Sequence, residues 1–526
     1  MIKNHLNIIL LTIVTVSAIL TSIKWMIPIF AWIMPVALLA YVRRNSGWKS
    51  ILLGIIFLGI GSGIAGYKVI PLPPHIFPVV MLIASFVTFI PYLVDKWLVD
   101  DKWRGFLSTL VFPITAVIIE YLMSLDPSQG TWGSIAITQY GNLPLMQLVS
   151  LTGIWGISFL IYWTASVINW IIENSESGNR AKAFFGFKIY ASVLFIIILF
   201  GSVSLIPSFI NTDKQVRIAA ISAPTAEMDE VIKTAYKAET NNELLNFSIK
   251  NFVPGTPKTS EGFSGLDAFF KNAKDQKFDP VHEKLEQYHN TLFALSQREV
   301  DGGAKIVVWS EAAGIIFLEE KDEFIQRGQE FARNNQVYLV LGISVQRPDS
   351  EKGDNLAITI SPDGEVLNSY GKSIPVPGEA SLAGDGIIPV FETEYGNIAV
   401  AICFDADHPG LIRQIGLKEA DILLLPSADW SAIVPYHSYM SVFRAIENGV
   451  SLVRPVSNGQ TLAVDSRGRV LFSTQETATS GWVPVNKTKT IYPYINDLFV
   501  WMSILGLFVI IIVRKLFIPR LIRQKK

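Results

Sequence analysis

The sequence predicts a multi-pass α-helical membrane domain joined to a layered α/β domain. The 526-residue chain is 50% hydrophobic and only 17% charged, which is too apolar for an ordinary soluble protein. Its apolar residues gather before about residue 210 and again after about residue 497. The stretch between them has ordinary charge density, and its strand-like and helix-like patterns alternate as they do in α/β domains.

Eight apolar segments are long enough for membrane-spanning helices, which need about 20 residues. Seven precede the polar region and one follows it. They lie at about 5–23, 25–41, 50–70, 76–94, 105–123, 148–172, 189–207 and 497–513. Lys3 before the first segment would also suit a signal peptide, but no small-x-small cleavage site follows it. We therefore expect a retained first helix.

Basic residues indicate which ends of these helices face the cytoplasm. They cluster in alternate loops and at the C-terminus, whereas no Lys or Arg occurs between Met123 and Leu148. The clusters are Arg43, Arg44 and Lys49; Lys96, Lys102 and Arg104; Arg180, Lys182 and Lys188; and Arg514, Lys515, Arg520, Arg523, Lys525 and Lys526. With eight spans, all of them fall on one side, as the positive-inside rule requires. We expect both termini in the cytoplasm and the polar domain outside it.

The expected organisation is a membrane domain over about 1–210, an extracytoplasmic domain over about 211–487, and a last span with a basic tail over about 488–526. The formal net charge of −1 argues against a nucleic-acid partner, because binding phosphates needs a basic excess.

Strands and helices alternate along the polar region. Apolar β-prone runs lie at about 215–223, 305–309, 337–345, 355–360, 397–403, 421–426 and 450–456, and helical patterns at about 281–299, 320–334 and 433–448. Turn residues at Ser361–Val366 and Asp465–Val470 predict two β-hairpins. The segment from about 239 to 280 lacks clear periodicity, and we expect a long loop, a lid or disorder there.

Three side chains capable of chemistry follow strand patterns: Glu311, Lys372 and Cys403. Cys403 is the only cysteine, so it cannot form an internal disulfide and is either a small buried apolar residue or a reactive group. Taken singly, a strand-terminal Glu is usually a solvated rim residue. Taken together, the three form a coherent nucleophilic site.

A thiolate is the nucleophilic form of cysteine. An ammonium such as that of Lys372 stabilises negative charge, and a carboxylate such as that of Glu311 can accept the thiol proton. The backbone N–H after Cys403 would be a second donor for an oxyanion. None of the six histidines is expected to pair with Cys403; His408 is expected to start a helix at Pro409.

Glu311, Lys372 and Cys403 resemble the Glu-Lys-Cys triad of the nitrilase, or carbon–nitrogen hydrolase, superfamily, and Arg444–Gly449 and Pro455–Gln460 resemble its later motifs. Within it, eight spans with the catalytic domain inserted before the last resemble the apolipoprotein N-acyltransferase family. The stretches Tyr140–Gln147 and Gly153–Phe159 are similar to a periplasmic loop and the sixth span of that family.

The resemblance implies a nitrilase-like α-β-β-α sandwich on the outer face of the bacterial plasma membrane. Cys403 would take an acyl chain from a phospholipid as a thioester and pass it to the amine of a lipidated apolipoprotein. Glu311 would be the general base, Lys372 the oxyanion stabiliser and Glu379 an additional active-site carboxylate. We expect a monomer that needs neither cofactor nor metal. Candidate substrate-binding residues are Phe404, Asp405, Trp132 and Tyr140.

The chain departs from the family pattern at three residues, in a Lys372-to-Glu379 spacing that is one residue shorter than expected, and in an insertion at about 239–280. Ser310 stands where Pro usually precedes the catalytic Glu, and Phe404 and Asp405 stand where Tyr and Glu usually follow the cysteine. The acyl donor and acceptor therefore stay open. Two other functions also stay open: a membrane-tethered amidase that releases its product to water, and a transporter or scaffold that only binds.

Two further features lie outside the triad. Glu120 occurs in an otherwise apolar span, where an ionisable group is costly and is either functional or partly solvated. Arg444 and Glu447 have the i,i+3 spacing of a helical ion pair.

Overall fold

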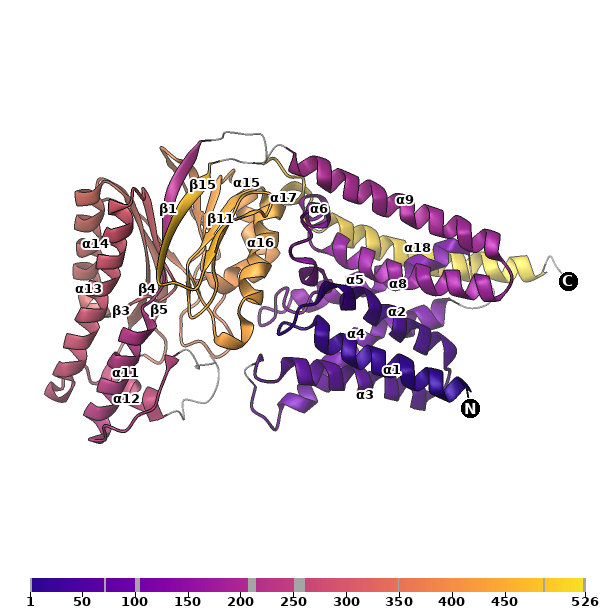
Figure 1. Ribbon diagram of the computed structural model, residues 1–526, viewed down its shortest axis with the longest axis horizontal. Coiled ribbons are helices and arrows are strands. Elements are labelled where there is room, and N and C mark those ends of the chain that lie inside the picture. Colours follow the sequence, from indigo (N-terminus) through magenta and orange to yellow (C-terminus); the bar gives the residue numbers. More distant parts are fainter. Residues whose placement is uncertain are drawn as a thin grey trace. The chain divides into compact units, whose positions relative to one another are not determined.

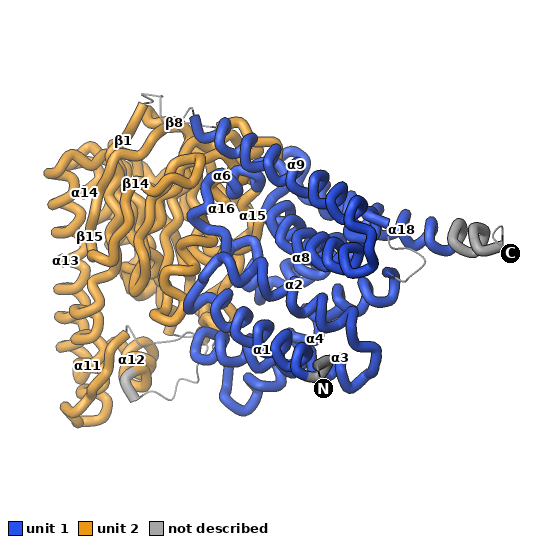
Figure 2. The backbone as a smooth tube through the Cα atoms, turned by 45° about the vertical axis from the view of Figure 1, so that its right-hand side comes forward, with its two compact units in different colours: residues 1–210, 494–526 blue, residues 211–493 orange. Residues whose placement is uncertain are grey.

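The computed structural model describes residues 2–70, 72–99, 105–206, 214–249, 261–348, 350–485 and 488–523. The chain forms two compact units (Figure 2): residues 1–210 with 494–526 make unit 1, and residues 211–493 make unit 2. Lys102, Arg104, Lys525 and Lys526, which belong to the predicted basic clusters, lie outside the described residues.

Each apolar segment predicted to span the membrane overlaps a helix of unit 1. These helices are α1 (Ile2–Thr21), α2 (Pro28–Arg44), α3 (Trp48–Gly66), α4 (Phe77–Leu98), α5 (Val111–Ser124), α8 (Trp155–Glu176), α9 (Arg180–Leu205) and α18 (Leu498–Arg523). Six helical segments within the described residues are long and apolar enough to cross a membrane: 48–66, 77–98, 106–124, 155–176, 180–205 and 498–515. The helical region with several apolar helices is thus confirmed.

The start of the sixth span differs from the prediction. The expected segment at about 148–172 is divided into a short α7 (Val149–Thr152) and the long α8, which begins at Trp155. Gly153, with φ of +61°, ends α7. A positive φ cannot continue a right-handed helix and is readily adopted by glycine, so the chain turns before α8 begins.

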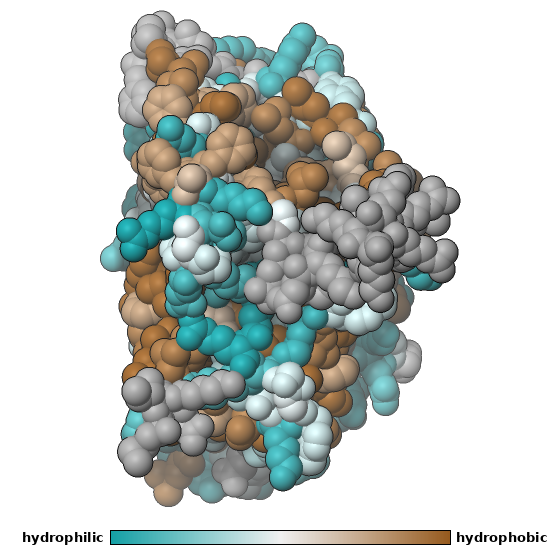
Figure 3. All heavy atoms as spheres, turned by 90° about the vertical axis from the view of Figure 1, so that its right-hand side faces the viewer, coloured by the Kyte–Doolittle hydropathy of each residue, from teal (hydrophilic) through white to brown (hydrophobic). Residues whose placement is uncertain are grey.

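The outward surface of unit 1 is apolar. Its helices expose large hydrophobic side chains, including Ile8, Phe195, Ile196, Leu505 and Phe508, each more than 60% exposed. Such a surface is unfavourable in water and suits lipid. The face drawn in Figure 3 carries hydrophilic side chains across its middle and hydrophobic ones along its margins.

Unit 2 contains two large sheets. In the first, the strand order is β15 (Ala478–Pro484), β1 (Gln215–Ile221), β2 (Ile306–Trp309), β4 (Tyr338–Gln346), β5 (Asp354–Ile360) and β6 (Val366–Gly371), with β3 (Gly314–Phe317) also paired to β4. In the second, the order is β14 (Val470–Thr474), β13 (Thr461–Val464), β11 (Ser451–Arg454), β9 (Ile422–Leu424), β8 (Gly396–Val400) and β7 (Val390–Thr393). The short strands β10 (Ser427–Ala428) and β12 (Val456–Ser457) form a separate parallel pair.

Each sheet has a parallel centre and antiparallel edges. Strands β1, β2 and β4 are parallel in the first sheet, and β8, β9 and β11 are parallel in the second. Both predicted hairpins are confirmed, since β5 pairs antiparallel with β6, and β13 with β14. The carboxyl ends of parallel strands are where α/β folds place their sites. Here Glu311 and Cys403 follow the parallel strands β2 and β8, whereas Lys372 follows the antiparallel edge strand β6.

Helices cover the outer face of each sheet, which confirms the α-β-β-α sandwich (Figure 1). The first sheet shares a buried apolar core with α11 (Thr225–Thr240), α12 (Glu261–Lys271), α13 (Asp279–Asp301) and α14 (Lys321–Asn335). Helices α15 (Pro409–Leu417) and α16 (Tyr436–Asn448) lie on the second sheet. Helix α15 starts after His408, as predicted.

The expectation of a structureless segment over about 239–280 is wrong for its second half. Residues 261–271 form α12, and Phe269 is completely buried against Phe278 and Phe317. Phe263, Leu266 and Phe269 recur every three residues, which is a helical spacing. The pattern is too short to stand out among the prolines and polar residues around it. Residues 250–260 of the predicted loop lie outside the described residues.

Candidate active site

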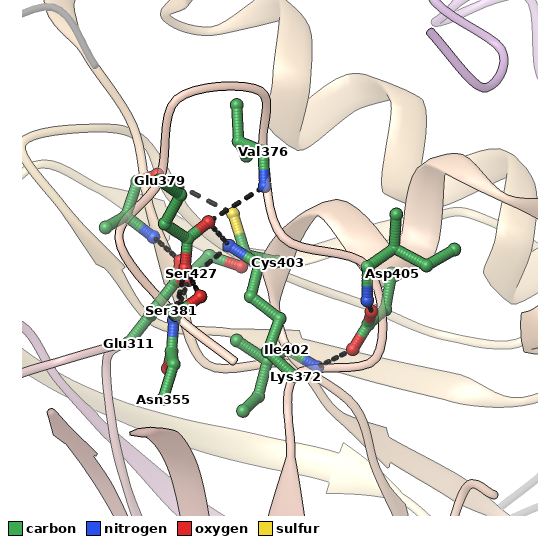
Figure 4. Close-up of polar contacts among 12 residues, drawn as sticks. Glu311, Asn355, Lys372, Val376, Glu379, Ser381, Ile402, Cys403, Asp405 and Ser427 are labelled. Atoms are coloured by element: carbon green, nitrogen blue, oxygen red, sulfur yellow. Dashed lines mark hydrogen bonds and ion pairs between the residues drawn. The ribbon is translucent and has the colours of Figure 1, made fainter. Parts of the chain in front are cut away.

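Three strand ends of unit 2 bring the predicted triad together. Glu311 follows β2, Lys372 follows β6, and Cys403 lies just beyond β8. Glu379 comes from the loop after β6, and Figure 4 shows all four side chains converging. Residues from two different sheets therefore form one site.

Lys372 lies at the centre of this site between two carboxylates. Its Nζ lies 2.6 Å from Oε1 of Glu311 and 2.6 Å from Oε2 of Glu379. The Lys372 and Glu311 side chains are almost completely buried, whereas that of Glu379 is 21% exposed. Burial alone would lower the pKa of Lys372, but the charges of Glu311, Cys403 and Glu379 outweigh it and raise that pKa well above its usual value. These neighbours therefore favour the charged form of Lys372.

Asn355 holds the two carboxylates in place. Its Nδ2 donates to Oε1 of Glu311 at 2.8 Å and to Oε1 of Glu379 at 2.9 Å. Glu379 also accepts from the hydroxyl of Ser381 at 2.8 Å and from the backbone N–H of Val376 at 2.9 Å. Burial opposes its ionisation, yet Lys372 and these donors lower the pKa of Glu379 below its usual value. Sequence reasoning missed Asn355, whose only signal was its position in a strand paired with the one before Lys372.

Cys403 occupies a turn that presents its thiol at the end of β8. Its φ of +47° is unusual for a side-chain-bearing residue, and such strained positions cluster at active sites. The Sγ atom lies 3.6 Å from the carbonyl oxygen of Ala428, whose backbone N–H donates to Oε2 of Glu311 at 2.9 Å. Ala428 thus links the thiol to the carboxylate.

The surroundings of the Cys403 thiol favour its protonated form. Burial is the main cause that raises its pKa well above the usual value; the charge of Glu311 adds to this, and Lys372 and Arg454 act in the opposite direction. A protonated thiol is a poor nucleophile. A nucleophilic role for Cys403 would therefore require a base, and Glu311 is the carboxylate connected to Cys403 through Ala428.

Asp405 connects the cysteine turn to the lysine loop. It is fully buried, and its carboxylate accepts from the hydroxyl of Tyr370 and the backbone N–H of Ile374, both at 2.8 Å, and from Ile402 N–H at 3.1 Å. Burial outweighs these donors and raises the pKa of Asp405 to about 6. Asp405 fixes the segments on either side of the site.

The other candidate substrate-binding residues have different surroundings. Phe404 is 4% exposed and packs edge-on against His408. Trp132 and Tyr140 belong to unit 1, in the segment between α5 and α6 (Leu143–Met146), and both are partly buried.

Ser310, the departure from the usual proline, is fully buried and bonded on both sides. Its hydroxyl lies 2.6 Å from that of Ser457 and accepts from the backbone N–H of Ala223 at 3.1 Å. These bonds join the end of β2 to the short strand β12 and to the segment after β1. At this position the backbone is held by the hydrogen bonds of the Ser310 hydroxyl, where a proline ring would restrict it directly.

A second group of buried charges lies beside Cys403. It consists of Asp407, Asp429, His437 and Arg454, each at most 5% exposed, and is called the histidine cluster below. His437 Nδ1 lies 2.6 Å from Oδ1 of Asp429, and its Nε2 lies 3.2 Å from Asp407. The Arg454 guanidinium donates to both oxygens of Asp429, at 2.9 and 3.1 Å.

The sequence showed no obvious Cys–His pair, but the structure places His437 close to Cys403. A ring nitrogen of His437, an oxygen of Asp429 and Sγ of Cys403 all lie within 4.8 Å of one another. Their identities would suit a metal ion, but Arg454 already occupies both oxygens of Asp429. Because Lys372 also adds a nearby positive charge, the donors fit an ion-pair network better than a metal.

Arg444 and Glu447 form the predicted ion pair on α16, with 2.9 Å between Arg444 Nη2 and Glu447 Oε1. Both are buried. Glu120 in unit 1 accepts from the hydroxyls of Ser134, Ser158 and Tyr162 at 3.0, 2.6 and 2.9 Å. Glu120, on α5, therefore connects the segment that follows α5 with helix α8 through hydrogen bonds.

The chain matches two protein-family models. Carbon-nitrogen hydrolase covers residues 275–485, and the apolipoprotein N-acyltransferase N-terminal domain covers residues 15–167. The first contains Glu311, Lys372, Glu379 and Cys403.

Two curated relatives are similar over most of their length. The apolipoprotein N-acyltransferase of Geobacter metallireducens is 25% identical over 456 residues, which cover 81% of this chain and 78% of that protein. Apolipoprotein N-acyltransferase 1 of Treponema denticola is 23% identical over 517 residues, covering 90% of this chain and 89% of that protein.

Solved structures match over part of the chain. An amidase from Nesterenkonia sp. is 20% identical with a TM-score of 0.34, covering 41% of this chain and 88% of that chain. A carbon-nitrogen hydrolase from Helicobacter pylori is 19% identical with a TM-score of 0.34, covering 39% of this chain and 85% of that chain.

Proposed function

We propose that this chain, which belongs to the apolipoprotein N-acyltransferase family within the nitrilase superfamily, carries an acyl chain on Cys403 from a membrane phospholipid to the N-terminal amine of a lipidated apolipoprotein. The convergence of Cys403, Glu311 and Lys372 in one buried site supports this proposal most strongly. The long apolar helices agree with a substrate drawn from a bilayer.

In the first half-reaction, the Glu311 carboxylate takes the proton from Sγ of Cys403 as the sulfur attacks the ester carbonyl carbon. The oxyanion that forms is stabilised by the Lys372 ammonium and by the backbone N–H after Cys403. When it collapses, the carbon–oxygen bond of the ester breaks. The leaving lysophospholipid oxygen takes the proton from Glu311, and a thioester remains on Cys403.

In the second half-reaction, the amine of the apolipoprotein attacks the thioester carbon. Glu311 accepts a proton from the attacking nitrogen and returns it to the sulfur as the carbon–sulfur bond breaks. An amide is formed and the thiol is regenerated. Glu379 keeps Lys372 in place in both halves through the 2.6 Å ion pair.

We further propose that the protein lies in the bacterial plasma membrane as a monomer, with both termini in the cytoplasm and unit 2 outside it. Asp405 and Phe404 would shape the site, and Trp132 and Tyr140 would contact lipid. No cofactor or metal takes part in the steps above.

The acceptor decides between transfer and hydrolysis. Purified protein is incubated with a phospholipid carrying a radiolabelled acyl chain and a synthetic diacylated lipopeptide. We expect label on the lipopeptide amine, and none when that amine is acetylated beforehand. Label released as free fatty acid at the same rate with and without lipopeptide would contradict transfer and support hydrolysis.

A further inference from the structure

The charges around Cys403 are not balanced by the triad alone. Lys372 is the one cation between the carboxylates of Glu311 and Glu379. Counted as ionised, these three groups carry one excess negative charge. A thiolate on Cys403 would add a second negative charge to the same buried site, and buried like charges disfavour ionisation.

The histidine cluster beside this site is electrically neutral only if His437 is protonated. Asp407 and Asp429 together are balanced by Arg454 and an imidazolium, whereas a neutral imidazole would leave the cluster negative. The charge of His437 therefore decides whether this cluster places a further negative charge beside Cys403.

The contacts of His437 favour its charged form. Each ring nitrogen faces a carboxylate, Asp429 from the segment after β10 and Asp407 from the turn that begins at Cys403. Arg454 approaches from β11, with Nη2 2.9 Å from Nδ1. Burial and Arg454 oppose protonation, but the two carboxylates outweigh them and raise the pKa of His437 to about 9.

We propose that His437 is a positioning residue for Cys403: held as an imidazolium between Asp407 and Asp429, it keeps the histidine cluster neutral, so that no further buried negative charge opposes transfer of the thiol proton to Glu311. His437 does not act as a base, because both of its nitrogens are engaged with carboxylates. The proposal rests on the proposed function only in taking Cys403 as the nucleophile.

Alkylation of the thiol tests this without any substrate. Cys403 is the sole cysteine, so the rate of iodoacetamide incorporation by the purified full chain reports this site alone. At pH 7.5 we expect His437→Gln to be alkylated at least about tenfold more slowly than the wild type, since one pKa unit changes the thiolate fraction tenfold. The gap should close above about pH 9, where the wild-type imidazolium loses its proton.

A matched control uses the other buried histidine of unit 2. His289 on α13 packs against Tyr288 and Phe324, and burial lowers its pKa to about 4. His289→Gln should be alkylated at the wild-type rate. Rates within twofold for wild type and His437→Gln, or a gap that stays constant up to pH 10, would overturn the proposal.

A second measurement needs no variant and stays informative if His437→Gln does not fold. In wild-type protein with ¹³C-labelled histidine, nuclear magnetic resonance should show that one of the six imidazoles titrates near pH 9. If every imidazole titrates below about pH 8, the imidazolium is absent and the proposal fails. Neither result depends on acyl transfer, so failure here and failure of the proposed function are distinguishable.

Discussion

Lys372 and Glu311 form a buried ion pair, with 2.6 Å between Nζ and Oε1. A lysine paired in this way keeps its charge and has a fixed direction. Such a group stabilises an oxyanion only if it is held where the negative charge develops. In the proposed mechanism, the ion pair therefore serves catalysis as well as the fold.

Removing the lysine should damage both stability and activity. Lys372→Met leaves the carboxylates of Glu311 and Glu379 without their cation, which should cost about 3–5 kcal/mol of unfolding free energy. Acyl transfer should fall at least about 100-fold. Thermal unfolding in detergent and a lipopeptide acylation assay measure the two effects.

The matched control for this change is Lys274→Met. Lys274 pairs with Glu319, but its side chain is 84% exposed. Exposed pairs contribute about 0–1 kcal/mol, so stability and activity should hardly change. Equal effects of the two substitutions would contradict the central position of Lys372.

Asp405 should give stability a distinctive dependence on pH. Its pKa in the folded protein is about 6, above the ordinary 3.8, so between these values the folded state holds a proton that the unfolded chain has released. The Asp405 contribution to stability therefore falls as pH rises from about 4 to about 6. At about 1.4 kcal/mol per pKa unit, the fall is about 3 kcal/mol.

Asp405→Asn removes this pH-dependent contribution to the unfolding free energy, because an amide does not titrate in this range. As pH rises from 4 to 6, the unfolding temperature of the wild type should fall steadily relative to that of the variant. Asp363→Asn, in the exposed turn between β5 and β6, should keep the wild-type profile. A difference that is the same at every pH would show that Asp405 does not titrate there.

Glu120 should be structural. Its carboxylate takes hydroxyl donors from Ser134, Ser158 and Tyr162, and Glu120→Ala would leave these groups without their acceptor. Losing such buried bonds should cost about 2–4 kcal/mol in total. Glu176→Ala, at a side chain that is 66% exposed, is the control and should be nearly neutral. Unchanged melting of Glu120→Ala in detergent would rule out this anchoring role.

The predicted orientation can be tested with single cysteines, because Cys403→Ala leaves the chain without any. In that background, Ser128→Cys should react with a membrane-impermeant maleimide in intact cells. Ser46→Cys, in the first basic loop, should react only after permeabilisation. Both positions are exposed in unit 1. The opposite pattern would reverse the topology.

Much of the fold could be predicted because its signals are local. The apolar runs of the spans and the strands ending at Trp309 and Val400 each lie in one continuous stretch. The triad followed from residues placed directly after strands, together with the resemblance to a known family. Each of these features requires only neighbouring residues.

The parts that were missed depend on contacts between distant segments. His437 reaches Cys403 only because α16 packs beside the turn after β8. Asn355 holds Glu311 across 44 positions of the chain. Neither residue carries a local pattern that differs from an ordinary core histidine or strand asparagine, so only the assembled sheets reveal them.

The most direct test of the account is the acyl-enzyme itself. Wild-type protein is incubated with a defined phospholipid and no acceptor, then analysed by intact and peptide mass spectrometry. We predict one added acyl chain on the peptide that contains Cys403, removed by neutral hydroxylamine, and none in Cys403→Ala. An acyl chain that appears equally in Cys403→Ala, or no adduct in wild-type protein that transfers label to lipopeptide, would contradict a thioester on Cys403.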